Sequence, residues 1–286
     1  MASMREIKRR KASIQSTVQI TKAMKLVSTV KYQKAKGRAE DARPYFEKMY
    51  ETMVSILSKT ETMANSQLVP GDSPDSAVIV ISSNRGLAGG YNSNVAKMLI
   101  NSELDKGHVK LYAVGSKGRD MLVKQGYPLA SDYSEVMDGP TYREAQDIMR
   151  EVLQAYQNNE VSAIYLAYTH FKNTVTHIPT FIKLLPAETK AEETEKEETA
   201  EAPMNFEPEE EEVLDAIIPK YITSLVYGAL MESVASENGA RMTAMDNATS
   251  NAEEIIGDLE LKYNRARQGA ITQEITEIVS GSEALS

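Results

Sequence analysis

The chain has 286 residues, with 32 Lys and Arg against 41 Asp and Glu, which gives a formal net charge of −9. It contains no Cys, which excludes disulfides, thiolate metal sites and cysteine nucleophiles. No stretch approaches the roughly 18 consecutive apolar residues of a membrane-spanning helix. The basic N-terminal end lacks the apolar core and cleavage site of a secretory signal, so we expect the chain to work where it is made.

Charge is strongly segregated along the chain. Residues 1–43 contain twelve Lys and Arg against three acidic residues, while residues 187–215 contain thirteen Asp and Glu against two Lys. The basic arm could neutralise phosphates of a nucleic acid, face an acidic protein surface or simply be solvated. Because it carries little interleaved aromatic character, the protein surface is the preferred interpretation. The acidic tract is most simply a solubilising loop, with a basic partner as the alternative.

The N-terminal segment from Arg5 to about Lys59 is rich in good helix formers, with one Gly (Gly37) and one Pro (Pro44). It predicts one long helix, with a possible kink at Pro44. The apolar stripe changes sides along this helix. Its first face holds Ile7, Ile14 and Val18, and the roughly opposite face holds Ile20, Ala23, Met24, Val27 and Val30.

The middle of the chain alternates between strand and helix patterns. After a Pro- and Gly-containing linker at 67–76, the strands are predicted at 77–82, 109–114, 161–171 and 176–185, and the helices at 92–104, 117–125 and 142–156 with Thr141 as N-cap. A four-residue polar turn at 172–175 joins the last two strands. This alternation favours a small, mainly parallel, Rossmann-like α/β layer with an antiparallel edge.

The C-terminal segment has the strongest periodicity. An acidic insertion at 187–212 is expected to be solvated or disordered. After it, the residues of the a and d positions follow 3-4 spacing: Met242, Met245, Thr249, Ala252, Ile256, Leu259, Tyr263, Ala266 and Ala270. A helix from Lys220 to Val279 would be roughly 90 Å long. Many of these seam residues are small or polar.

The predicted fold class is therefore α/β plus coiled coil. Long N- and C-terminal helices pair antiparallel as a shaft, with the α/β module between them in sequence. We expect five segments: an N-terminal shaft helix at 1–66, the linker at 67–76, the α/β module at 77–186, the acidic insertion at 187–212 and a C-terminal shaft helix at 213–286.

Two local patterns invite a functional interpretation. The loop Ser83–Asn92 follows the first strand and opens a helix, where a phosphate-binding loop would lie, but its glycines at 86, 89 and 90 match neither a dinucleotide fingerprint nor a P-loop. A structural turn is the preferred interpretation. His108, His170 and His177 have no metal-ligand spacing, and no catalytic Ser, His and Asp arrangement is recognisable, so catalysis by this chain alone is not expected.

The residues at both ends of the chain carry more information than their helical periodicity. The segments at 5–10, 21–27, 240–253 and 261–279, together with the central Arg-Gly-Leu-Ala-Gly-Gly-Tyr-Asn at 85–92, closely resemble the γ subunit of F-type ATP synthases of the bacterial type. The resemblance spans essentially the whole chain in family order. Ala88 stands where Cys is common in that family.

This resemblance implies a central-stalk rotor that couples transmembrane proton or sodium flow to ATP synthesis. Its implied partners are the α and β subunits of the catalytic ring, the ε subunit and the ring of c subunits, with no nucleic acid, cofactor, metal or catalytic residue of its own. The implied contacts with β subunits are Met24, Lys25, Arg241, Arg267, Gln268, Thr272 and Glu274, the implied apolar bearing is Ile275, Ile278 and Val279, and the structural turn of the foot is Arg85, Gly86, Gly89 and Gly90.

The resemblance also implies a location in the cell, but it does not identify the driving ion. A bacterial member would lie at the cytoplasmic face of the cell membrane, attached through its partners. The absence of Cys excludes the thiol switch of chloroplast members. The driving ion is set by the c subunit, so the sequence leaves proton and sodium equally open.

Overall fold

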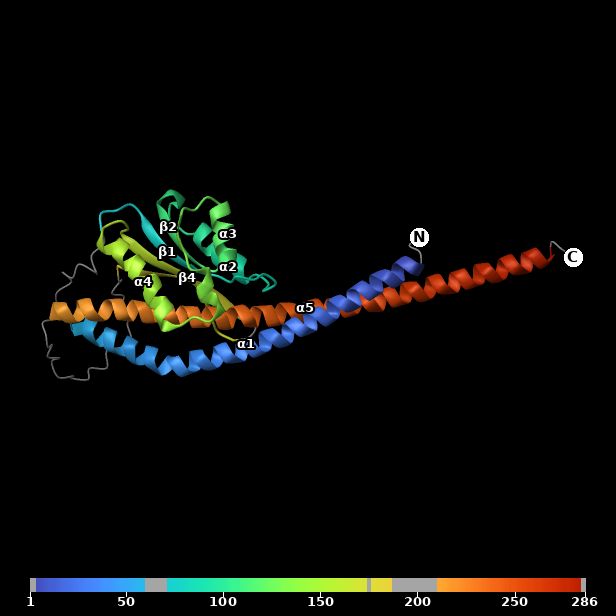
Figure 1. Ribbon diagram of the computed structural model, residues 1–286, viewed down its shortest axis with the longest axis horizontal. Helices are drawn as coiled ribbons and strands as arrows, with labels where there is room; N and C mark the ends of the chain where they lie inside the picture. The colour runs from blue at the N-terminus through green and yellow to red at the C-terminus, as the bar shows by residue number, and fades with distance from the viewer. Residues whose placement is uncertain (1–3, 60–70, 174–175, 187–209, 284–286) are drawn as a thin grey trace. The chain divides into compact units, whose positions relative to one another are not determined.

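The computed structural model describes residues 4–59, 71–173, 176–186 and 210–283. The chain forms two compact units, one from residues 1–29 and 241–286 and the other from residues 30–240. Two long helices, α1 (Met4–Lys59) and α5 (Glu210–Glu283), each contribute to both units (Figure 1). We call the first the helix-pair unit and the second the α/β unit. Most of the acidic insertion, parts of the linker and of the polar turn lie outside the described residues.

The α/β unit is built on a five-stranded sheet in the order β3-β2-β1-β4-β5. Its strands are β1 (Ser76–Ile81), β2 (Val109–Val114), β3 (Leu129–Asp132), β4 (Ala163–Phe171) and β5 (His177–Leu185). All pairings are parallel except that of β5 with β4. The predicted mainly parallel sheet with an antiparallel edge is confirmed. The short edge strand β3 was not predicted.

Helices cover both faces of this sheet. They are α2 (Tyr91–Ile100), α3 (Ser116–Lys124) and α4 (Tyr142–Gln157), with short 3-10 turns at Lys106–His108 and Ser134–Asp138. The predicted N-cap is confirmed, because Thr141 and Glu144 form a reciprocal capping box that satisfies two backbone donors at the start of α4.

Side chains that alternate along the strands form two apolar cores. On one face Ile79 of β1 and Leu166 of β4 pack with α4 and with the N-terminal part of α5, through Ile222 and Val226. On the other face Val78 and its neighbours pack with α2 and α3. Because both faces of the sheet are covered, the central strand β1 is a continuous apolar run from Ala77 to Ile81, as expected for a parallel sheet.

Helix α5 begins at Glu210, three residues before the expected C-terminal shaft segment at 213–286. The helix runs through Pro219, and the hydroxyl of Thr223 donates to the Pro219 carbonyl at 2.6 Å. Packing of Ile218 and Ile222 against the sheet compensates for the backbone hydrogen bond that proline removes.

In the helix-pair unit, α1 and α5 run antiparallel. Lys11 pairs with Glu260 at 2.7 Å, Lys22 with Glu253 at 2.7 Å and Lys25 with Asp246 at 2.6 Å, so residue numbers rise along one helix as they fall along the other. Between these ion pairs the buried hydroxyls of Thr21 and Thr249 lie 2.7 Å apart. The predicted antiparallel pairing is confirmed for this unit.

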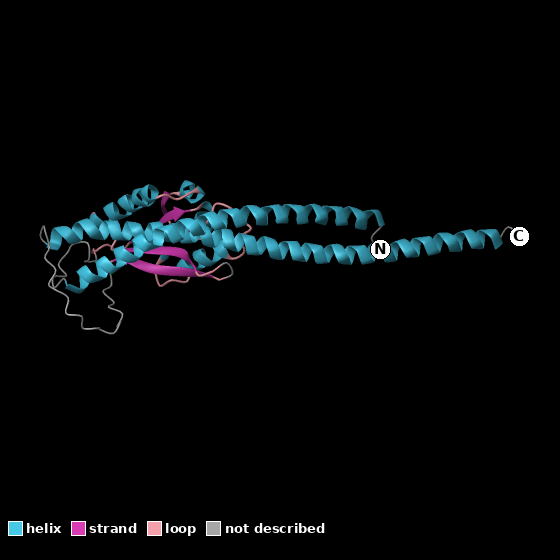
Figure 2. Cartoon of the chain, turned by 90° about the horizontal axis from the view of Figure 1, so that it is seen from below, coloured by secondary structure: helices cyan, strands magenta, loops and turns pink. Residues whose placement is uncertain are grey.

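The seam of α5 follows the predicted heptads. Met245, Thr249, Ala252 and Leu259 are buried, whereas Ala270 is exposed. Within this unit α5 continues past the N-terminal end of α1 (Figure 2), which leaves the last predicted seam position without a facing helix.

The seam of α1 differs from the stripe read off the sequence. The buried and half-buried residues recur at 3-4 spacing: Met4, Ile7, Lys11, Ile14, Val18, Thr21, Lys25 and Ser28. The face of α1 that packs against α5 therefore stays the same along the helix. Up to Val18 this seam contains apolar residues, and beyond Val18 it continues through polar residues. Polar residues are tolerated in this seam because their polar groups form hydrogen bonds or ion pairs, as the hydroxyl of Thr21 does with that of Thr249.

No helix among residues 4–59, 71–173, 176–186 and 210–283 is long and apolar enough to span a membrane.

Candidate functional site: the helix pair and the loop after β1

A second apolar face of α1 is left uncovered in the helix-pair unit. Ile20, Leu26 and Val27 are 57 to 68% exposed, while Met24 is half-buried between this face and the seam. Val30, the first residue of the α/β unit, is exposed as well. Single exposed apolar residues are common, but several within ten residues of one helix mark a surface that a partner covers.

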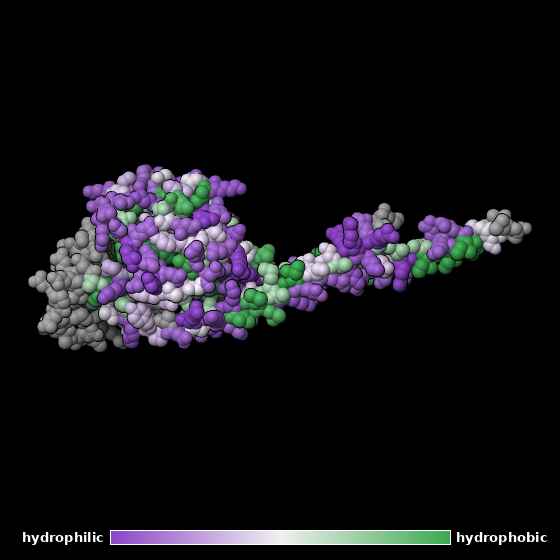
Figure 3. Space-filling view, viewed as in Figure 1, coloured by the Kyte–Doolittle hydropathy of each residue, from purple (hydrophilic) through white to green (hydrophobic). Residues whose placement is uncertain are grey.

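A similar apolar stripe lies near the end of α5. Ile271, Ile275 and Ile278 recur at i, i+4 and i+7, and with Val279 they are 48 to 65% exposed. Figure 3 shows this surface as a green stretch toward the C-terminal end of the helix. The predicted bearing residues Ile275, Ile278 and Val279 thus share one solvent-facing stripe, and the sequence analysis missed Ile271, which the same spacing could have identified.

The predicted polar contact residues fall into two groups. Arg241 is buried, with 7% of its surface exposed, and Lys25 forms the ion pair with Asp246 of the facing helix. The second group is exposed on α5 and consists of Arg267, Gln268, Thr272 and Glu274. The Thr272 hydroxyl donates to the Gln268 carbonyl at 2.9 Å.

The loop after β1 is held by its own polar groups. The Asn92 side-chain oxygen accepts from the Ser83 amide at 2.9 Å, and the Ser83 hydroxyl lies 2.6 Å from the Arg85 carbonyl. Gly89 has a φ of +57°, the left-handed conformation that favours glycine. Leu87 has a φ of +61° and is exposed. Arg85, Gly86 and Gly90 are exposed, and the role of this loop as a structural turn stays a prediction.

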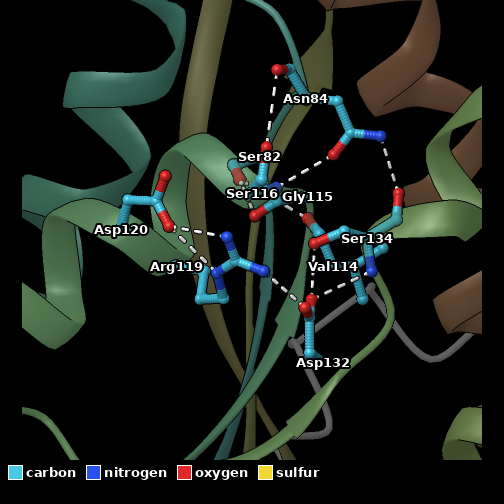
Figure 4. A network of polar contacts seen from close by, with 9 residues as sticks. All are labelled: Ser82, Asn84, Val114, Gly115, Ser116, Arg119, Asp120, Asp132 and Ser134. Carbon is cyan, nitrogen blue, oxygen red and sulfur yellow. Dashed lines mark hydrogen bonds and ion pairs between the residues drawn. The ribbon is translucent and has the colours of Figure 1, made fainter.

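At the carboxyl edge of the sheet, side chains that follow β1 accept hydrogen bonds from the first backbone amides of α3. Figure 4 shows Asn84 accepting from the Ser116 amide at 2.9 Å, and the Ser82 hydroxyl accepts from the Gly118 amide at 2.9 Å. The Ser83 carbonyl accepts from the Lys117 amide at 3.0 Å. A helix N-terminus at this edge is where α/β proteins commonly bind phosphate, and here its donors are taken by the protein itself.

Arg119 of α3 extends the same polar network through two ion pairs. Its guanidinium contacts Asp120 and Asp132, and Asp132 also accepts from the backbone and hydroxyl of Ser134 (Figure 4). Burial acts to raise the pKa of Asp132, but its hydrogen bonds with Ser134 and Arg119 outweigh burial and lower it. The carboxylate therefore joins α3, β3 and the following turn in its charged form.

His108 precedes β2, whereas His170 and His177 lie on the paired strands β4 and β5, where His177 is opposite Phe171. His108 Nδ1 lies 2.8 Å from Asp75, a hydrogen bond that raises the pKa of His108, and His170 Nδ1 lies 2.8 Å from Glu232. Within the described ranges no three His, Asp or Glu side chains are grouped as a metal site would require.

Comparison with known proteins accounts for this combination of an α/β sheet and a helix pair with exposed apolar faces. A family model described as ATP synthase matches residues 3–285. Over 290 aligned residues the chain is 58% identical to the ATP synthase gamma chain of Lachnoclostridium phytofermentans, with all of both chains covered. It is 41% identical to the gamma chain of Acetobacterium woodii, described as sodium ion specific, with 99% of each covered. The chain therefore belongs to the ATP synthase family and, within it, to the γ chains, the central-stalk rotor subunits.

Solved structures share the fold. A mitochondrial ATP synthase chain from Euglena gracilis, in a structure of the F1 part and c-ring, superposes with a TM-score of 0.68 at 17% identity, covering 99% of this chain and 94% of that chain. A chain from the central stalk and c-ring of Tetrahymena thermophila gives a TM-score of 0.57 at 24% identity, covering 80% and 99%. The predicted combination of long helices and α/β sheet is thus confirmed at the level of the fold.

Proposed function

We propose that the exposed faces of the helix-pair unit couple this rotor subunit to the α and β subunits of the catalytic ring. The observation that carries the proposal is the uncovered apolar stripe of α5, formed by Ile271, Ile275, Ile278 and Val279. Four large apolar side chains on one helix face lose contact with water only when a partner covers them. In this proposal Ile275, Ile278 and Val279 form an apolar bearing, on which a helix can turn because apolar contacts impose no fixed orientation.

The polar residues next to this stripe are proposed to make the contacts that depend on angle. Arg267, Gln268, Thr272 and Glu274 are exposed and carry charges and hydrogen-bonding groups of both kinds. Met24 and Lys25 on α1, with Arg241 on α5, are proposed to position the part of the pair that faces the β subunits. A rotor must be asymmetric, because a surface that contacted all three β subunits equally would shift no equilibrium between their states.

We propose that the chain catalyses no reaction by itself. We infer that nucleotide chemistry occurs on the ring. In this chain Ser82, Ser83 and Asn84 already accept from the N-terminal amides of α3, which leaves these amides unavailable to a phosphate. The turn containing Arg85, Gly86, Gly89 and Gly90 then has a structural role in the foot. The α/β unit is proposed to join the ε subunit and the c-ring, at the cytoplasmic face of a bacterial membrane.

Co-purification tests this function. With an affinity tag on a β subunit, we expect this chain to be recovered at one copy per three β subunits and three α subunits, and the isolated chain to have no ATPase activity. Recovery without a fixed ratio, or ATP turnover by the pure chain that Arg85→Ala abolishes, would contradict the proposal.

A further inference from the structure

Strand β4 is longer than its parallel neighbour. The pairing of β1 with β4 ends at Val80 and Ala167, whereas β4 continues to Phe171 and beyond Ala167 pairs only with β5. Among the residues that the structure describes, backbone groups at the end of β4 that face the β1 side therefore have no strand partner. Backbone N–H and C=O groups removed from water need other partners.

Helix α5 supplies these partners through two side chains. Glu232 Oε2 accepts from the Phe171 amide at 3.4 Å and lies 2.8 Å from His170 Nδ1. The Ser236 hydroxyl donates to the Thr169 carbonyl at 3.3 Å. Since Glu232 and Ser236 are four residues apart, they lie on the same face of α5. We call these five residues the strand-end clamp.

The clamp differs in kind from the contacts that precede it along α5. Between Ile218 and Leu230 the helix packs on the sheet through apolar side chains. Burial of apolar surface is strong but non-directional, so it resists separation of helix and sheet more than rotation of the helix about its axis. Hydrogen bonds weaken steeply when their geometry is lost, so the clamp opposes such rotation.

The clamp also reaches α1. The Phe171 ring lies 5.7 Å from the Tyr32 ring of α1, centroid to centroid, in a tilted contact. Burial, together with the negative charge of Glu232, raises the pKa of Tyr168 to about 12. A single strand end thus contacts both long helices inside the α/β unit.

We propose that Glu232 is a positioning residue that fixes the rotational setting of α5 on the sheet and so transmits torque between the foot and the shaft. This inference rests on the proposed rotor function. It adds a role for Glu232, a residue that belongs to none of the sequence motifs described above. When torque acts between foot and shaft, apolar packing alone allows the helix to turn against the sheet, and the clamp prevents this slip.

The test uses the assembled ATP synthase in vesicles, with ATP hydrolysis and ATP-driven ion uptake measured on the same preparation. In Glu232→Ala we expect hydrolysis to continue while the ratio of uptake to hydrolysis falls by roughly threefold, because two directional contacts to a charged acceptor are lost. Glu232→Gln keeps an acceptor for the Phe171 amide, and we expect it to retain most of the ratio. Glu103→Ala removes an exposed carboxylate of the same unit and serves as the matched control.

The outcomes separate this inference from the proposed function. If Glu232→Ala co-purifies with the ring at the normal ratio of subunits and pumps as many ions per ATP as the wild type, the clamp does not transmit torque and the inference is wrong. If the mutant assembles less but the assembled enzyme has a normal ratio, Glu232 only stabilises the fold, which also overturns the inference. If the wild-type chain itself does not co-purify with the ring, it is the proposed function that fails.

Discussion

Replacing Gly115 by alanine is expected to destabilise the α/β unit severely. Gly115 has a φ of +104°, and a Cβ built on it would lie 2.2 Å from the Ser82 carbonyl oxygen. That carbonyl belongs to backbone at the end of β1, where the Ser82 amide donates to the Val114 carbonyl at 2.7 Å, so it cannot move aside without breaking the sheet edge. We expect a loss of more than about 3 kcal/mol of unfolding free energy, a large part of the roughly 5–15 kcal/mol that stabilises a domain.

Urea unfolding of the purified chain, followed by circular dichroism, measures this effect. Gly257→Ala is the matched control, because Gly257 lies in α5 with open space around its Cα, and alanine favours a helix over glycine by about 1 kcal/mol. We expect the control to unfold at the same or a higher urea concentration than the wild type. A Gly115→Ala chain that unfolded together with the wild type would show that the turn after β2 adapts, contrary to the geometry described.

The double substitution Ile275→Asp, Ile278→Asp is expected to have the largest functional effect. Both side chains are more than half exposed, so the isolated chain should retain its stability to within about 0.5 kcal/mol. In the assembled enzyme the proposed function places them against an apolar partner surface, where unpaired carboxylates cost several kcal/mol. We therefore expect ATP synthesis in vesicles to fall by about tenfold or more.

The conservative pair Ile275→Leu, Ile278→Leu controls for shape, since it keeps the apolar character of the stripe. We expect it to assemble and to synthesise ATP at close to the wild-type rate. Normal ATP synthesis by the double Asp variant would mean that this stripe faces solvent in the working enzyme, and the bearing would have to be assigned elsewhere.

Much of the fold could be predicted because its elements carry strong local signals. The wholly apolar run of β1, the heptads of α5 and the capping box at Thr141 each follow from short-range physical chemistry. Strand β3 could not be predicted, since Leu129 and its three neighbours form a short edge strand with little buried surface. Its place is set by pairing with β2 and by the ion pair of Arg119 with Asp132, which join residues distant in sequence.

The candidate site could be predicted only in part, for a related reason. Periodicity identifies the helix faces, but not which of two apolar faces a partner helix covers. On α1 the seam runs through Thr21 and Lys25, whose role depends on Thr249 and Asp246 more than two hundred residues away. The strand-end clamp was missed because Glu232 is an ordinary acidic residue in a helix until the fold brings Phe171 to it.

Rotation observed in single molecules tests the rotor account most directly. The chain has no Cys, so Glu103→Cys gives the α/β unit a unique site for a visible marker, while the catalytic ring is fixed to a surface. With ATP, we expect the marker to turn continuously in one direction and to stop when ATP is removed. ATP hydrolysis by the same molecules with a marker that only fluctuates, without net direction, would contradict the rotor account.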